Sequence, residues 1–524
     1  MQTTIATLRC SNLSCQHPNL ESLTHCEKCS TPLLKRYLWV DGEGVAKQWV
    51  GNLLSNRFLV KSEKVVLDTQ PQLPVVVQAE HSELGLPYLK LFAHRPHIPQ
   101  PYSILYLESK SQPLLLLEDA PIHRHDLPEA IGINTCIGST LPIETAWSQA
   151  GALRQLNWLW QIAQLWEPLD TEGVASTLLQ PSLIRVEGSL VRLLELSQAA
   201  TGMKLGYLGR SWQHWVAAAA HPDIREGLSR LCEQLISRKI ATANHLIAQL
   251  DQEIDRVGRS QSIQFTVAAQ TDQGPTRSRN EDACYLTDHT AFINLPLTVV
   301  CDGMGGHAGG DIASNLAIES ISQHIQSAHI QNAQPHEITS ALTKSLHAAN
   351  HLINESNNQS QRHGHGRMGS TAVIALANPP KMYVASVGDS RAYWITQHGC
   401  HQITMDDNMA TRWVRTGVGL YRETRHQPHG ASLIQALGVH DSELVHPNIY
   451  QVVIDEDCIF LLCSDGLSDY DRIEECWETE LLPVLNDEMD LAVAARRLVD
   501  VANYKNGHDN VTVSLIHCRI FPRN

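Results

Sequence analysis

The sequence predicts an α+β protein with about three folded parts, of which the C-terminal part is the largest. In the first half, short apolar runs bounded by Pro and Gly, typical of strands, precede stretches in which apolar residues recur at helical spacing. In the second half, apolar runs end repeatedly in Asp followed by Gly or Ser. Strands that come first and helices that follow favour layered units over a helical bundle.

The composition is that of a folded protein with an acidic surface. Of the 524 residues, 43% are hydrophobic and 18% are charged, and the net charge is −15 at pH 7. No block rich in Lys and Arg is present, so we expect no nucleic-acid partner. The sequence contains no secretory signal and no run of about 18 apolar residues, so we expect a cytoplasmic protein without a membrane partner.

Residues 1–35 carry a metal-site pattern made of four cysteines: Cys10, Cys15, Cys26 and Cys29. Two cysteine pairs joined by a short loop suit tetrahedral Zn²⁺. A segment this small has almost no core, so the ion would supply its folding free energy. His17 or His25 could replace one thiolate, and four buried free cysteines are the alternative. The segment resembles a zinc ribbon, a unit that usually docks partners.

The order of strand and helix patterns in residues 36–250 predicts an α+β regulatory domain. Strands are expected within 51–60 and over 75–77, 88–92, 104–107 and 114–117. Helices are expected over 153–163 and 228–236, where apolar residues recur at helical spacing. The polar stretch 251–262 predicts a linker to a last domain over 263–524.

Two pieces of this region resemble parts of protein kinases. Residues 182–195 resemble the hairpin after the kinase catalytic loop, and residues 51–60 resemble the approach to the first kinase strand. There is no G-x-G-x-x-G, no H-R-D and no D-F-G, whose place would be taken by Glu195-Leu196-Ser197. Phosphoryl transfer needs the lysine, the metal-binding Asp and the base together. We therefore expect a degenerate kinase-like domain, or an unrelated α+β module.

Residues 263–524 hold five motifs in a fixed order. They lie at 271–282, 297–311, 368–374, 384–393, and in two parts at 459–469 and 508–513. Three apolar runs deliver an Asp at their ends, and a fourth Asp stands just before a strand: Asp302, Asp389, Asp465 and Asp509. Converging carboxylates would repel one another at pH 7 unless a cation such as Mg²⁺ or Mn²⁺ neutralised them. A single Asp-Gly is usually a turn, but turns do not explain all five motifs in this order.

This set of motifs resembles the PPM family of metal-dependent protein phosphatases, the type 2C serine/threonine enzymes, in their bacterial form. The resemblance implies an α/β/β/α four-layer β-sandwich with two Mn²⁺ or Mg²⁺ ions and room for a third. Carried over by motif, Asp302 bridges both ions and the Gly303 carbonyl binds one. The remaining ligands would be Asp465 and Asp509, with Glu281 and Asp282 binding directly or through water, and Asp389 with Asp469 at a third ion.

The same resemblance implies that a water activated by the two ions attacks phosphorus while Arg277 clamps the phosphate. His307 is a candidate general acid, although a helix-capping or solvent-exposed histidine is the alternative. Cys301 and Cys463 lie inside apolar strands and are expected in the core. A flap is expected over 396–437, where Asp406-Asp407-Asn408 replaces a common Asp-His-Ser.

The sequence therefore predicts a metal-dependent protein serine/threonine phosphatase that acts on phosphorylated proteins. Its N-terminal region would regulate it or dock kinase and signalling partners. The alternative is a non-catalytic signalling scaffold that uses the phosphatase fold and the zinc ribbon to bind partners. The intact Asp302, Asp465 and Asp509 favour the enzyme, because a scaffold has little reason to keep an acidic cluster.

Overall fold

A computed structural model describes residues 7–73, 83–106, 113–123, 126–127, 140–286, 296–305, 309–328, 330 and 333–522. The chain forms two compact units. The first contains Met1–Glu253 and Trp413–Thr424, and the second contains Ile254–Arg412 and Arg425–Asn524.

The second unit contains two antiparallel sheets. One has the strand order β12 (Gln261–Asp272), β22 (Val511–Pro522), β21 (Cys458–Cys463), β18 (Arg391–Ile395) and β19 (Cys400–Gln402). The other has the order β13 (Asp282–Leu286), β14 (Leu297–Met304), β16 (Ala372–Asn378), β17 (Lys381–Val387) and β20 (Asn448–Val453), and β15 (Gly369–Ser370) pairs with β14.

The two sheets pack face to face. The hydroxyl of Thr298 on β14 hydrogen-bonds that of Ser514 on β22, and both residues are buried. The alternate residues of β14, Val299 and Cys301, face a different core that includes the helices over this sheet. Alternation along a strand buried on both faces explains the nearly continuous apolar runs seen in the sequence.

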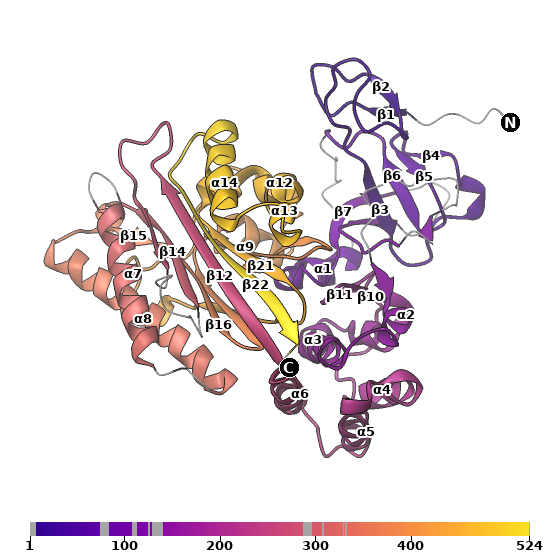
Figure 1. The fold of residues 1–524 in the computed structure, drawn as a ribbon. Helices are drawn as coiled ribbons and strands as arrows, with labels where there is room; N and C mark the ends of the chain where they lie inside the picture. Colours follow the sequence, from indigo (N-terminus) through magenta and orange to yellow (C-terminus); the bar gives the residue numbers. More distant parts are fainter. Residues whose placement is uncertain are drawn as a thin grey trace. The chain divides into compact units, whose positions relative to one another are not determined.

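Helices cover the outer face of each sheet (Figure 1). Helices α7 (Gly310–Ser327) and α8 (Pro335–Gln359) pack on the sheet that contains β14. Helix α14 (Leu491–Lys505) packs on β12 and β22, together with α11 (Asp465–Ser468), α12 (Arg472–Glu480) and α13 (Leu482–Leu485) on that side. The predicted α/β/β/α sandwich is confirmed, and Cys301 and Cys463 are buried in it as expected.

The first unit begins with the cysteine segment, whose β1 (Thr7–Arg9) and β2 (Pro18–Leu20) form a hairpin. A six-stranded sheet follows, in the order β4 (Leu53–Leu54), β5 (Phe58–Val60), β6 (Val65–Asp68), β3 (Arg36–Val40), β8 (Leu114–Glu118) and β7 (Gln100–Leu105). A smaller sheet joins β9 (Leu141–Pro142), β10 (Ile184–Glu187) and β11 (Leu190–Leu193).

The helices of the first unit follow mostly after its larger sheet. They are α1 (Leu86–Lys90), α2 (Ile143–Trp147), α3 (Ala152–Thr171), α4 (Gly206–Ala219), α5 (Pro222–Ile236) and α6 (Ala243–Gly258), whose last turn belongs to the second unit. The segment Trp413–Thr424 adds the short helix α10 (Tyr421–Thr424). The predicted strands within 51–60 and at 114–117, the hairpin within 182–195 and the helices at 153–163 and 228–236 are confirmed. None of the helices in the described part of the chain is long and apolar enough to cross a membrane.

Two predicted elements differ from the structure. The strand expected over 88–92 is wrong, because residues 88–90 lie in α1, Leu91 follows its end, and Phe92 begins the 3-10 helix Phe92–His94. Pro87 lies in the first turn of α1, where its fixed φ favours a helix. The linker expected over 251–262 is helical up to Gly258, and β12 begins at Gln261. The strand expected over 75–77 lies outside the described residues.

Candidate active site

Neighbouring strands place the first two acidic residues of the site beside each other. Asp282 on β13 and Asp302 on β14 are directly opposite in the antiparallel ladder. The backbone N–H of Asp302 donates to Thr371 Oγ1 at 3.0 Å, and that of Gly303 donates to the Glu281 carbonyl at 3.2 Å. A Cβ at Gly303 would lie 2.1 Å from the Gly310 carbonyl oxygen, so only glycine fits there.

The opposite sheet supplies two more acidic residues. Asp465 begins α11, one residue beyond the end of β21, and Asp509 stands two residues before β22. The two loops touch, because a Cβ at Gly466 would lie 2.0 Å from the Asn510 carbonyl oxygen. Aspartates that are far apart in sequence therefore come from adjacent strand ends of one sheet.

Asn510 and Ser464 hold the two sheets' loops together. The Asn510 side chain donates to the Gln273 and Arg279 carbonyls, both at 2.8 Å, and accepts from the Glu281 N–H at 2.9 Å. Ser464 Oγ donates to Asp282 Oδ2 at 2.7 Å across the sheets. Both residues lie inside the motifs at 459–469 and 508–513, and their role follows from partners that only the tertiary fold brings near.

The electrostatics show that these carboxylates crowd one another. Burial raises the pKa of Asp302 well above its usual range, and the charges of Asp465, Asp282, Asp389 and Asp509 raise it further. Burial likewise raises the pKa of Asp282 to about 7. Without a cation, each of these two groups resists ionisation at neutral pH.

Two oxygens of this acidic cluster (Glu281, Asp282, Asp302, Asp389, Asp465, Asp469 and Asp509) are buried and lack a protein hydrogen-bond partner. They are Asp282 Oδ1 and Asp465 Oδ1. A buried acceptor without a donor is unfavourable, and a divalent cation bound to oxygen ligands would satisfy it. Asp302, Asp389, Asp465 and Asp509 are half-buried, so the cluster is open to solvent on one side. The donor set therefore fits Mg²⁺ or Mn²⁺.

The cluster has more carboxylates than a single ion needs. Its members interact strongly, because Asp465, Asp282, Asp389 and Asp509 all raise the pKa of Asp302 and Asp465 raises that of Asp389. Mg²⁺ is usually held by one or two carboxylates, so seven of them suit more than one ion.

Arg277 is a basic residue at the edge of the cluster, paired with one of its aspartates. Its Nη2 pairs with Asp509 Oδ2, while 49% of its side chain stays exposed. The structure thus brings Arg277 to the acidic residues with part of its guanidinium open to solvent. His307, the candidate general acid, lies outside the described residues, as does Gly306.

Asp389 lies where a second network approaches the cluster. Burial raises its pKa, and the charges of Asp465 and Asp406 raise it further. Arg391 pairs with Asp406 at 2.7 Å and donates to the Ser468 carbonyl at 3.1 Å. Burial and the Asp465 charge raise the pKa of Asp469 to about 6. Asp389 and Asp469 are therefore both electrostatically coupled to Asp465.

The start of the flap is fixed to the loop that carries Asp389. Asp407 Oδ2 accepts from the Gly388 N–H at 3.0 Å and from Gln435 Nε2 at 2.6 Å, and the Asp407 N–H donates to the Gly388 carbonyl at 2.9 Å. Asp407 occupies the middle position of the replaced Asp-His-Ser, and it serves here as a buried acceptor.

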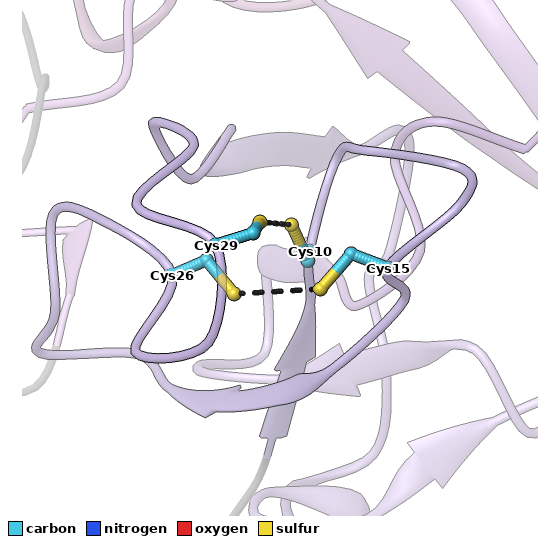
Figure 2. Close-up of side chains that lie close together, drawn as sticks. All are labelled: Cys10, Cys15, Cys26 and Cys29. Carbon is cyan, nitrogen blue, oxygen red and sulfur yellow. Dashed lines mark hydrogen bonds between the residues drawn. The ribbon is translucent and has the colours of Figure 1, made fainter.

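The four N-terminal cysteines converge (Figure 2). The Sγ atoms of Cys10 and Cys29 are 3.5 Å apart, and those of Cys15 and Cys26 are 3.9 Å apart. Hydrogen bonds from Thr31 lower the pKa of Cys29 to about 6, whereas burial raises the pKa of Cys10 to about 12. His17 and His25 are not part of this group of ligand atoms. Four converging sulfurs suit one tetrahedral Zn²⁺.

Glu195, at the place of the kinase metal-binding Asp, is bound by neighbouring side chains. Trp39 Nε1 donates to Glu195 Oε2 at 2.6 Å, and Lys64 Nζ pairs with the same oxygen at 2.8 Å. The carboxylate is thus neutralised within its own unit.

Comparisons with known proteins match residues in the second half of the chain. The profile of the family described as protein phosphatase 2C matches residues 275–500. The serine/threonine phosphatase stp of Listeria monocytogenes serotype 4b is 32% identical over 248 residues, which are 47% of this chain and 93% of that protein. The chain belongs to the protein phosphatase 2C family.

Two solved structures are also similar. The serine/threonine phosphatase of S. agalactiae is 26% identical, with a TM-score of 0.42 over 48% of this chain and 98% of that chain. The catalytic domain of the serine/threonine protein phosphatase PstP, solved in complex with 2 manganese ions, is 28% identical, with a TM-score of 0.39 over 49% of this chain and 100% of that chain.

Proposed function

We propose that the second unit removes phosphate from phosphoserine and phosphothreonine in proteins, using two Mn²⁺ or Mg²⁺ ions at the acidic cluster. The observation that carries the proposal is the pair of buried, unpartnered oxygens on Asp282 and Asp465 among carboxylates whose charges oppose one another. The serine/threonine phosphatase named among the relatives supports the substrate class.

The proposed ligands follow from the placement of the carboxylates. Asp302, from the middle of the cluster, would contact both ions, and the Gly303 carbonyl would contact one. Asp465 and Asp509 would hold the other ion, with Glu281 and Asp282 binding directly or through water, and Asp389 with Asp469 would suit a third ion. When bound, two such ions supply Lewis acidity and lower the pKa of a water toward about 7.

The protein's own groups would then position the substrate. The Arg277 guanidinium offers paired donors to phosphate oxygens, and its ion pair with Asp509 holds it at the cluster. Thr371 and Ser464 fix Asp302 and Asp282 through the hydrogen bonds described above, which limits their movement when a phosphate binds. His307 remains the candidate that would protonate the leaving oxygen.

Hydrolysis of p-nitrophenyl phosphate and of a phosphothreonine peptide tests this function. We expect turnover with Mn²⁺, none with EDTA, and none in Asp302→Ala with Mn²⁺. Asp500→Ala, which removes an exposed carboxylate of α14, is the matched control and should keep wild-type rates. Wild-type turnover in Asp302→Ala, or in EDTA, would refute the assignment.

We also propose that the cysteine segment binds one structural Zn²⁺ and that the first unit regulates the enzyme or docks kinase or signalling partners. The convergence of four thiols supports the zinc site. The neutralised Glu195 supports a kinase-like unit without kinase chemistry. A cytoplasmic location would keep the thiols reduced and available to the ion.

A further inference from the structure

We infer that the first unit holds the flap of the phosphatase and thereby sets the affinity for phosphoprotein substrates. The inference rests on the proposed function for its substrate. Its structural basis is that Trp413–Thr424, which lies inside the phosphatase sequence, belongs to the same compact unit as Met1–Glu253.

The two ends of this flap segment are anchored in the second unit. The Met409 N–H donates to the Ser432 carbonyl and the Ala410 N–H donates to the Gly430 carbonyl, both at 2.9 Å. After the segment, Arg425 pairs with Asp471 at 2.8 Å. Residues 413–424 therefore leave the phosphatase fold and return to it at fixed points.

Arg422 makes the central polar contact of the flap segment. Its Nη1 lies 3.5 Å from Glu118 Oε2 on β8, and its guanidinium carbon lies 4.6 Å from the centre of the Tyr102 ring on β7. Arg36 also pairs with Glu118, at 3.0 Å, and lies over the same ring at 5.4 Å. Two cations thus share one carboxylate and one aromatic ring, and both contacts favour this place for Arg422, whose Nη1 makes an ion pair but no hydrogen bond to a described residue.

Apolar and ring contacts flank this ion pair. The rings of Tyr421 and Phe92 have centroids 5.0 Å apart. Gly417 lies so close to α1 that a Cβ there would be 2.8 Å from Leu86 Cδ1. Leu420 is only 5% exposed. The contact therefore combines one ion pair with ring and apolar packing around it.

A flap held from outside the phosphatase fold is ordered before substrate arrives. Releasing it would add the cost of ordering the segment to each binding event, which raises KM for a large substrate that contacts the flap. A small aryl phosphate needs only the acidic cluster and Arg277, so releasing the flap should not change its kinetic constants. A partner that binds the first unit near β7 and β8 could use this contact to change substrate affinity.

The test uses the full-length chain with Arg422→Ala and Tyr421→Ala. Arg230→Ala is the matched control, because Arg230 pairs with Glu226 on the exposed face of α5. Hydrogen exchange should speed up about fivefold or more over residues 413–424 in both variants and stay unchanged in the control. Arg422→Lys should give an intermediate rate, because it keeps the charge but loses the planar stacking.

With Mn²⁺, KM for a phosphothreonine protein should rise about threefold or more in both variants, while kcat/KM for p-nitrophenyl phosphate stays within about twofold. Unchanged exchange over 413–424 would overturn the docking, and an unchanged or lower KM would overturn its effect on substrate affinity. If the wild-type chain shows no turnover at all, the proposed function and the effect on substrate affinity both fail, and the exchange measurement still decides the docking.

Discussion

Asp282→Asn should stabilise the ion-free protein, and more at pH 8 than at pH 5. Asp282 Oδ2 accepts a hydrogen bond from Ser464, while Oδ1 is buried without a partner near the charges of Asp465 and Asp509. An asparagine can keep the acceptor toward Ser464 and present an amide donor where the unpartnered oxygen lies. The substitution therefore removes a buried charge without removing its hydrogen bond.

The magnitude follows from the raised pKa of Asp282. Burial is its main cause, and the charges of Asp465 and Asp509 add to it, against the hydrogen bonds from Ser464 and Thr512. Because the pKa is higher in the folded state, the folded protein binds this proton more tightly, so stability falls as the pH rises from 3.8 through about 7. At 1.36 kcal/mol per pH unit, that interval corresponds to about 4 kcal/mol at pH 8 and to less than about 2 kcal/mol at pH 5.

The gain in the free energy of unfolding from Asp282→Asn is thus expected to be about 3 kcal/mol larger at pH 8 than at pH 5. For a domain of this size, that difference corresponds to about 6–12 °C in Tm. Calorimetry in EDTA at the two pH values measures it, and comparing them cancels any packing effect of the amide. Asp500→Asn, at an exposed position, should show no such difference. An equal Tm change at both pH values would refute the reasoning, and Mn²⁺ should stabilise the wild type more than the variant.

Three further substitutions test other parts of the molecule. Arg277→Ala should raise KM for phosphate esters about tenfold or more with a smaller change in kcat, because a charge-assisted donor pair is lost; an unchanged KM would contradict the clamp. Cys29→Ser should remove the zinc measured by elemental analysis, whereas His17→Ala should retain it, and the opposite pattern would place a histidine in the site. Gly466→Ala should lower the free energy of unfolding in urea by about 1–3 kcal/mol and weaken Mn²⁺ binding, because the new Cβ would lie 2.0 Å from the Asn510 carbonyl oxygen. Gly85→Ala is the control, because a Cβ there meets open space, and it should leave both the stability in urea and the Mn²⁺ affinity unchanged.

The local pattern predicted much of the second unit because its strands are buried on both faces. The run that ends in Asp302 is β14, and the run before Asp465 is β21. A short apolar stretch followed by Asp and Gly is typical of the end of a buried strand, so both the element and the position of the carboxylate could be predicted here.

The sequence contains signals for the two helices that were not predicted, the end of α6 and the start of α1. Leu246, Leu250 and Ile254 are fully buried at a spacing of four residues, so the stripe of α6 continues into the segment assigned to a linker. Pro87 near the start of an apolar stretch is a helix-start signal, and it outweighs the strand propensity of the residues after it.

Other features had no local signal. The roles of Asn510 and Ser464 depend on partners more than 180 residues away, so no sequence pattern identifies them. The assignment of Trp413–Thr424 to the first unit is of the same kind, because Glu118 and Tyr102 become its neighbours only in the folded chain. Motifs identify the chemical groups of a site, whereas tertiary contacts decide what holds them in place.

The acidic cluster and the flap therefore follow different physical rules. The backbone around the cluster is tightly packed, because Gly303 and Gly466 allow contacts that a residue with a Cβ could not make. The carboxylates of the cluster repel one another until a cation binds. The flap segment is held by one shared carboxylate, one shared ring and a few apolar contacts, each of modest strength. A signal received by the first unit could release such a contact at little cost, whereas it could not rearrange the cluster. Regulation at the flap would then change which phosphoproteins bind without changing how their phosphate is removed.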